Sequence, residues 1–380
     1  MQFIKYVLSI VLLLIGSITI LLEEPLFGIG LLLIGLLLMP LSSKFLTKKA
    51  PKLFTKRNKT LISLSIGLVI VVAIGSFGRK QYNQVEKITN EKLVSLSIHP
   101  VKKIVVNKLD YYYIEKGEGE TILLLHGFPD MANTWDETIS ELSKTHRVIA
   151  PFLRGYYPTG IPKDNDFSVK TIADDMVKLL DGLSIDKFTV VGQDWGASIG
   201  FSVTNLADER VQKFVSLAIP HTSCLELTPS LAYAGRHFLL LGTSDYGVRY
   251  ARKSNFEYID RLYQRWSPDF KNFQASSDAI KETFKFPNRT EAAIGYYRSF
   301  SKDQNVSEVQ EFYQKVPKTP VLFLLGEHDL IYSEKMVSSM KEKMPEGSKT
   351  VVFKNAGHFL HREVFPEFIS ELKAFLNNNN

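Results

Sequence analysis

Short apolar runs, each followed by a polar or glycine-containing loop, recur along the chain from about residue 101 onward. Four of them have the sequences TILLL, FTVV, PVLFLL and TVVF, at residues 121–125, 188–191, 320–325 and 350–353. Unbroken apolar runs of this length are typical of strands that are buried on both faces. The pattern therefore predicts buried strands, and the loops that follow them contain the candidate functional residues.

The N-terminal part of the chain follows a different pattern. Residues 6–22, 25–41 and 61–77 are charge-free, mainly apolar runs, each near the lower length limit for spanning about 30 Å of hydrocarbon. A cleaved signal peptide would account only for the first run, and a soluble helical hairpin would need a polar face that the first two runs lack. The pattern predicts a membrane anchor at residues 1–82 with three spans, or two as the alternative, and a polar tether at residues 83–100.

Charge separates the same two parts of the chain. Residues 1–82 carry ten Lys and Arg against two acids, a net charge of +8, which leaves −2 for the rest of a chain whose total is +6. Residues 42–60 contain seven of these cations and no acid, so the positive-inside rule places this loop in the cytoplasm. With three spans, the remainder is expected on the extracytoplasmic side of a multi-pass membrane protein that contacts lipid through its N-terminal helices.

The segment FTVVGQDWGA at residues 188–197 has the form of a nucleophile elbow, in which a strand, a sharp turn and a helix follow one another. Glycines beside the turn let the backbone adopt a strained conformation that raises one side chain above the sheet. If the strand ends at Val191, Asp194 occupies the tip, and Ser198 of the serine-hydrolase match GASIG lies inside a helix at residues 195–206. We predict Asp194 as the nucleophile; the alternative is an Asp that only caps this helix.

The loop after the first of these strands carries the sequence HGFP. At the matching place in α/β-hydrolases, a backbone N–H joins the N–H of the residue after the nucleophile to form the oxyanion hole. The two donors would be the amides of Phe128 and Trp195. We expect His126 to brace this loop rather than to act as a base.

The last two strands each precede one further candidate. Asp329 follows the strand PVLFLL, and His358 follows the strand TVVF in the sequence Ala-Gly-His. The chain order Asp194, Asp329, His358 is the order nucleophile, acid, histidine of the α/β-hydrolase fold. These three residues are the predicted catalytic core.

Residues 101–376 resemble α/β-hydrolases of the epoxide hydrolase and haloalkane dehalogenase branch. Three segments carry the resemblance, because HGFP is similar to the HGxP loop of that branch, GQDWG to its GxDWG elbow and RGY at residues 154–156 to its RGYG segment. The resemblance implies an α/β-hydrolase fold, with a mostly parallel eight-stranded sheet and helices on both faces. The core would comprise residues 101–220 and 317–380, and a helical lid residues 221–316.

The expected lid follows from the length of one connection. About a hundred residues separate the strand near 211–219 from the strand at Val321, which is too many for a simple turn or helix between adjacent strands. Helices are expected at residues 230–241, 256–266 and 291–302.

Within this insert, IGYYRSF is closely similar to the lid helix of epoxide hydrolases whose Tyr donates a proton to the epoxide oxygen. The match selects Tyr297. The sequence RHF resembles a variant branch with a His-Phe pair, which implies His237 as the second donor, with Tyr246 and Tyr233 as alternatives. The substrate pocket would then contain Phe128, Trp195, Phe238 and Tyr297.

The resemblance implies an epoxide hydrolase that forms an ester on Asp194 and releases a vicinal diol from a small apolar substrate. A haloalkane dehalogenase with the same nucleophile is the alternative, because the indole of Trp195 can bind a halide; Trp266 would be the second halide donor if it faced the pocket. A non-catalytic binding module is the second alternative, since this fold is reused for binding.

Other classes lack their signatures in this sequence. Cys224 is the only cysteine, the eight His show no metal-ligand spacing, and no glycine-rich phosphate loop is present. We therefore expect no cofactor and no metal. Outside the anchor no basic stripe remains for nucleic acid, and the sequence leaves the oligomeric state open.

Overall fold

The computed structural model describes residues 97–378 apart from 227 and 243, together with residues 12, 13, 16 and 32. The chain divides into two compact units, which are Met1–Lys87 with Gly235–Leu240, and Ile88–Ala234 with Leu241–Asn380. The sheet and the candidate site belong to the second unit.

The predicted membrane spans at residues 6–22, 25–41 and 61–77 lie outside the described residues, except for the four single positions named above. Most of the predicted tether at residues 83–100 also lies outside them. Among the residues that are described, no helix combines the length and apolar character needed to cross a membrane.

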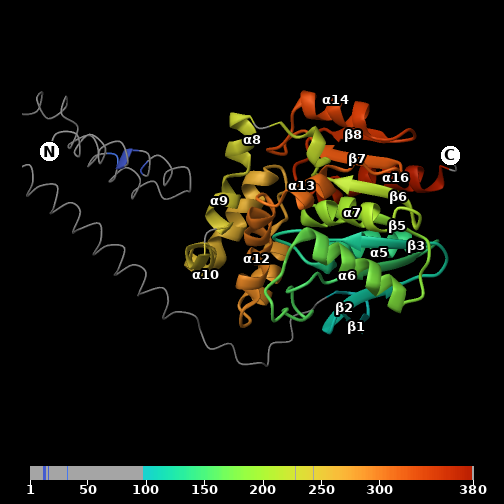
Figure 1. Cartoon of the computed structure of the whole chain (residues 1–380), viewed down its shortest axis with the longest axis horizontal. Helices are drawn as coiled ribbons and strands as arrows, with labels where there is room; N and C mark the ends of the chain where they lie inside the picture. Colours follow the sequence, from blue (N-terminus) through green and yellow to red (C-terminus); the bar gives the residue numbers. More distant parts are fainter. Residues whose placement is uncertain are drawn as a thin grey trace, which may run out of the picture. The chain divides into compact units, whose positions relative to one another are not determined.

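The second unit is built on an eight-stranded sheet with the order β1-β2-β4-β3-β5-β6-β7-β8, visible at the right of Figure 1. Strand β2 runs antiparallel to both of its neighbours, and the other adjacent pairs are parallel. This sheet confirms the predicted α/β-hydrolase fold. The strands are β1 Val101–Val106, β2 Leu109–Lys116, β3 Thr121–Leu125, β4 Arg147–Pro151, β5 Phe188–Gln193, β6 Val211–Leu217, β7 Val321–Gly326 and β8 Lys349–Phe353.

Helices connect and cover these strands. Helix α7 packs on β3, β5 and β6 and lies beside α6. Strands β3, β5 and β7 are buried along their whole length, which is the physical reason for their mainly apolar sequences. The helices of the core are α5 Asp136–Leu142, α6 Val169–Gly182, α7 Trp195–Leu206, α14 Glu334–Lys343, α15 Leu360–Glu363 and α16 Phe365–Asn377.

The described residues between β6 and β7 form helices and loops and contain no strand. The helices are α8 Pro229–Ala234, α9 Arg236–Gly242, α10 Ser244–Trp266, α11 Gln274–Phe284, α12 Arg289–Asp303 and α13 Ser307–Gln314. In Figure 1, the arrow of β6 points toward α13, and α12 lies on the same side of the sheet. These two helices therefore lie at the end of the sheet where the loops after the parallel strands emerge.

Several element bounds differ from the sequence-based expectations. The helix expected at residues 230–241 is two helices that break at Gly235, because glycine is a poor helix former. The helix expected at 256–266 is the second half of α10, which has non-helical dihedral angles from Lys253 to Phe256. Strand β5 continues to Gln193 instead of ending at Val191, and helices α11 and α13 were not predicted.

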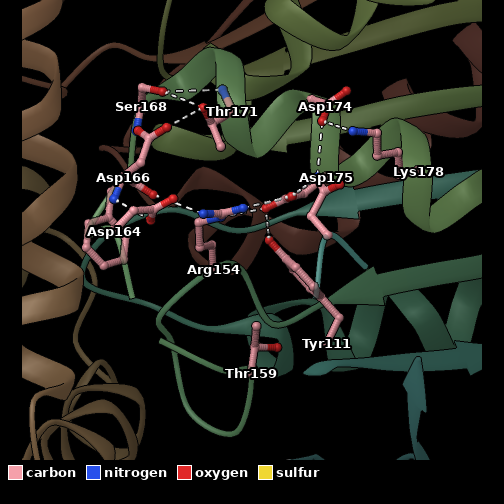
Figure 2. A network of polar contacts seen from close by, with 12 residues as sticks. Tyr111, Arg154, Thr159, Asp164, Asp166, Ser168, Thr171, Asp174, Asp175 and Lys178 are labelled. Atoms are coloured by element: carbon pink, nitrogen blue, oxygen red, sulfur yellow. Dashed lines mark hydrogen bonds and ion pairs between the residues drawn. The ribbon is translucent and has the colours of Figure 1, made fainter. Parts of the chain in front are cut away.

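A buried ion pair fixes the loop that follows β4. The guanidinium of Arg154 donates through Nε to Asp175 Oδ2 at 2.6 Å and through Nη2 to Oδ1 at 2.9 Å. The Tyr111 hydroxyl donates to Oδ2 of the same carboxylate at 2.5 Å. Figure 2 shows this carboxylate between Arg154 and Tyr111, with Asp174 on the same helix paired to Lys178 instead.

The same loop anchors helix α12. The Tyr296 hydroxyl donates to the carbonyl oxygen of Arg154 at 2.8 Å, and Nη1 of Arg289 donates to the carbonyl oxygen of Gly155 at 3.0 Å. The ion pair of the core thus holds the backbone on which α12 rests.

Removing one partner of this ion pair tests its contribution. Asp175→Ala leaves the guanidinium buried without its carboxylate, so we expect the free energy of unfolding to fall by about 3 to 5 kcal/mol. Chemical denaturation measures this change. Asp174→Ala is the matched control: its side chain is 45% exposed, and loss of a surface pair costs about 1 kcal/mol or less. Equal losses of unfolding free energy in the two variants would contradict a stabilising role for the buried ion pair.

Candidate active site

Asp194 lies at the turn between β5 and α7 in a strained backbone conformation. Its dihedral angles are φ 53° and ψ −121°, a region that residues other than glycine rarely adopt. A Cβ atom on Gly196 would lie 2.1 Å from the carbonyl oxygen of Leu125, and one on Gly127 would lie 2.4 Å from Cβ of Asp194. Both positions therefore require glycine. Ser198 lies inside α7, so the GASIG match does not form the elbow.

The Asp194 carboxylate faces two groups from other loops. Its Oδ1 accepts the backbone N–H of Phe128 at 2.7 Å, and its Oδ2 lies 3.3 Å from Nε2 of His358. Its side chain makes no capping hydrogen bond to α7. The helix-cap alternative is therefore wrong for this described residue.

His358 lies between two carboxylates. Its Nδ1 is 2.8 Å from Oδ2 of Asp329, and both side chains are buried. A carboxylate at Nδ1 fixes the ring so that Nε2 faces Asp194. Burial lowers the pKa of His358, but the charges of Asp329 and Asp194 outweigh this effect and raise the pKa to about 10. Both carboxylates therefore favour the charged, imidazolium form of the ring.

His126 braces the loop that carries Phe128. Its Nε2 accepts the backbone N–H of Leu153 at 3.1 Å, so its proton lies on Nδ1, which is 3.0 Å from the carbonyl oxygen of Gly127. Burial lowers the pKa of His126 to about 4 and keeps the ring neutral. This geometry matches the bracing role expected from the sequence, because the ring ties the loop after β3 to the loop after β4.

Tyr297 of α12 lies against Phe128 and Trp195, beside Asp194. Its ring is buried and makes edge contacts with Phe128, at a centroid distance of 5.3 Å, and with Trp195, at 5.1 Å. Burial and the charge of Asp194 raise the pKa of Tyr297 well above its usual value, against a smaller opposing effect of its hydrogen bond with Trp195. The hydroxyl therefore keeps its proton and is available as a donor. The structure brings the rings of Phe128, Trp195 and Tyr297 into contact beside Asp194.

The predicted second proton donor, His237, belongs to the first unit, as does Phe238. The ring centroids of these two residues are 4.7 Å apart. The alternatives Tyr233 and Tyr246 are 52% and 40% exposed. The role of His237, and that of Phe238 in the pocket, stay predictions.

Sequence reasoning missed the surroundings of His358. The ring of Trp266, at the end of α10, lies 5.0 Å from the ring of His358, whereas the sequence suggested Trp266 only as a halide donor. Gln193 donates from Nε2 to the carbonyl oxygen of His358 at 3.3 Å. No local signal marks such contacts, because they join segments far apart in the chain. Among the described residues, no cluster of three or more His, Cys, Asp or Glu could hold a metal ion.

Known proteins are similar to this chain in sequence and in fold. Residues 120–363 match the family described as alpha/beta hydrolase fold. A protein named Epoxide hydrolase 3 from Siraitia grosvenorii is 26% identical over 310 residues, which cover 72% of this chain and 97% of that protein. Epoxide hydrolase 4 from Homo sapiens is 25% identical over 295 residues, covering 73% and 78%.

Among solved structures, the epoxide hydrolase CorEH without ligand has a TM-score of 0.63 to this chain at 20% sequence identity. The match covers 73% of this chain and 98% of CorEH. At this identity the likeness shows the fold alone.

The charge of His358 has a measurable consequence for stability. Its pKa in the folded protein, about 10, exceeds its usual value of 6.5, so its stabilisation is complete below pH 6.5 and is lost as the pH rises through 10. We expect the difference in unfolding free energy between the wild type and His358→Gln to shrink from pH 6 to pH 10. Denaturant titrations at both pH values measure it; a constant difference would contradict the imidazolium.

Proposed function

Because this chain belongs to the alpha/beta hydrolase fold family, we propose that it is a hydrolase that opens an epoxide to a vicinal diol through an ester on Asp194. One observation carries the proposal: a carboxylate at the elbow lies between the Phe128 N–H and the His358 imidazole, beside the buried Tyr297. The relatives named epoxide hydrolases support it. The aromatic walls of the site favour a small apolar substrate.

In the first step, Oδ2 of Asp194 attacks an epoxide carbon, and the carbon–oxygen bond of the strained ring breaks. The departing oxygen takes the proton of the Tyr297 hydroxyl, which leaves a hydroxyalkyl ester and a phenolate. The imidazolium of His358 supplies the proton that restores the phenol. Ester formation removes the charge of Asp194, and with it one of the two charges that raise the pKa of His358.

In the second step, the neutral imidazole removes a proton from water, and the resulting hydroxide attacks the ester carbonyl of Asp194. The oxyanion of the tetrahedral intermediate lies on the amides of Phe128 and Trp195. Collapse of the intermediate breaks the bond to the diol oxygen, which takes the proton of the hydroxyl group that came from water. The Asp194 carboxylate is restored beside an imidazolium. The cycle consumes one water and one epoxide and restores the starting protonation of Asp194, Tyr297 and His358.

Dehalogenation is the second candidate, because the buried indole of Trp195 directly follows the nucleophile. A halide leaves as an anion and needs donors but no transferred proton. The buried, protonated Tyr297 is required only when the leaving oxygen must be protonated, and it favours the epoxide.

Trapping the ester tests this mechanism. His358→Gln removes the base for the second step, so incubation with styrene oxide should add the mass of one epoxide to the protein, as measured by intact mass spectrometry. The same variant carrying Asp194→Asn should gain no mass. Absence of label in His358→Gln would refute an ester mechanism, and the non-catalytic binding module would remain as the alternative.

Tyr297→Phe, introduced into the His358→Gln variant, distinguishes epoxide opening from loss of a halide. Labelling by the epoxide should slow by roughly a hundredfold, since general acid catalysis contributes about 10²- to 10⁴-fold, while labelling by a primary alkyl halide should persist. Equal effects on both probes would favour a structural role for the hydroxyl.

The proposal includes a membrane location for this enzyme. The three charge-free runs and the basic loop at residues 42–60 support a multi-pass anchor with the hydrolase on the extracytoplasmic side. A reporter that is active only in the cytoplasm should be silent when fused after Asn380 and active when fused after Lys52. Activity after Asn380 would mean that the orientation is inverted.

A further inference from the structure

The loop that carries His358 is held by one carboxylate outside the predicted catalytic set. Glu363, the last residue of α15, accepts the N–H of Gly357 through Oε2 at 2.9 Å and the N–H of Phe359 through Oε1 at 3.0 Å. These two amides flank His358 on either side. The two oxygens of a single side chain therefore fix the backbone before and after the imidazole.

The same carboxylate also reaches the end of lid helix α10. Ser267, which directly follows α10, donates from Oγ to Oε1 of Glu363 at 2.6 Å and accepts the N–H of Phe359 at 3.1 Å. The N–H of His358 itself donates to the carbonyl oxygen of Trp266 at 2.9 Å. The amides of three successive residues in the histidine loop thus all bond to Glu363 or to the end of α10.

Close packing leaves this assembly little freedom. A Cβ atom on Gly357 would lie 2.4 Å from the carbonyl oxygen of Trp266 and 2.6 Å from Cα of Ser267. Ser267 is buried, and the ring of Trp266 lies against the ring of His358. The histidine loop and the end of α10 therefore touch through their backbones, and a shift of one requires a shift of the other.

We propose that Glu363 is a positioning residue for His358, and that through Ser267 it couples the orientation of the imidazole to lid helix α10. The inference rests on the proposed two-step mechanism. In that mechanism His358 must first lie against Asp194 and then face a water at the ester carbonyl, so its backbone has to be held while its partner changes charge. Misplacement of a catalytic group by about 1 Å can cost a hundredfold in rate.

The proposed coupling predicts different effects on the two chemical steps. Ester formation depends on the attack by Asp194 and on the proton of Tyr297, and the His358 proton is needed only afterwards, to restore the phenol. Ester hydrolysis depends on the direction of the His358 Nε2 atom. Loss of the clamp should therefore slow the second step and spare the first, whereas a purely structural role would lower stability without separating the two.

Glu363→Gln tests the inference because glutamine keeps only one acceptor oxygen. Its amide nitrogen is a donor and cannot accept the second backbone N–H. In single-turnover reactions with styrene oxide, we expect ester hydrolysis to slow by up to roughly a hundredfold, with the rate of ester formation within about twofold of wild type. Ester should then accumulate in the intact-mass spectrum during steady state. Ser267→Ala, which keeps the Glu363 carboxylate, should slow ester hydrolysis to a smaller extent. This variant provides the test if Glu363→Gln does not fold.

Glu367→Gln is the matched control, because Glu367 is an exposed acid in the first turn of the next helix. It removes the same charge nearby and should leave both steps unchanged. Hydrolysis at the wild-type rate in folded Glu363→Gln and Ser267→Ala, or equal slowing of both steps, would overturn the positioning role.

A substrate-free measurement separates this inference from the proposed function. The proton on Nδ1 of His358, bonded to Asp329, gives a downfield NMR signal that should shift or broaden in Glu363→Gln and stay in place in Glu367→Gln. If His358→Gln traps no ester, the proposed function fails, and the NMR signal still decides the positioning role. An unchanged signal in Glu363→Gln would overturn it.

Discussion

The positive φ angle of Asp194 is the constraint on which the rest of the site depends. The turn after β5 can raise this carboxylate above the sheet only because the neighbouring backbones approach without side chains at Gly127 and Gly196. A strained residue of this kind costs about 1 to 3 kcal/mol and persists only where its surroundings over-determine it. Here the hydrogen bond from Phe128 and the facing imidazole of His358 hold the carboxylate in place.

The parallel sheet explains why residues so far apart in the chain meet. Strands β3, β5, β7 and β8 run in one direction, so the loops after their carboxyl ends emerge at one edge. Phe128, Asp194, Asp329 and His358 each come from one of these loops. Tyr297 approaches from α12, which rests on the loop fixed by the ion pair of Arg154 and Asp175. The site therefore joins a rigid sheet to a lid helix that the core itself anchors.

Local sequence was sufficient for the core and insufficient for the lid. Strands buried on both faces are uniformly apolar, and the loops after them carry short motifs, so the elbow and the order Asp194, Asp329, His358 could be predicted from the sequence. The break from Lys253 to Phe256 could not, because three of these residues adopt positive φ angles without a glycine. Glu363 escaped prediction for another reason: its partners, including Ser267, become neighbours only in the folded chain.

The charges around His358 suit the proposed mechanism, in which Asp194 is consumed and regenerated. The charges of Asp329 and Asp194 raise the pKa of His358, so the proposed first step begins with a proton held beside the site. The proposed ester on Asp194 would remove one of those charges, and Asp329 would keep the ring oriented while the affinity of the ring for the proton falls. A base that forms only after the ester exists cannot remove a proton from water too early. A serine at the elbow would provide no such change, since its hydroxyl carries no charge to lose.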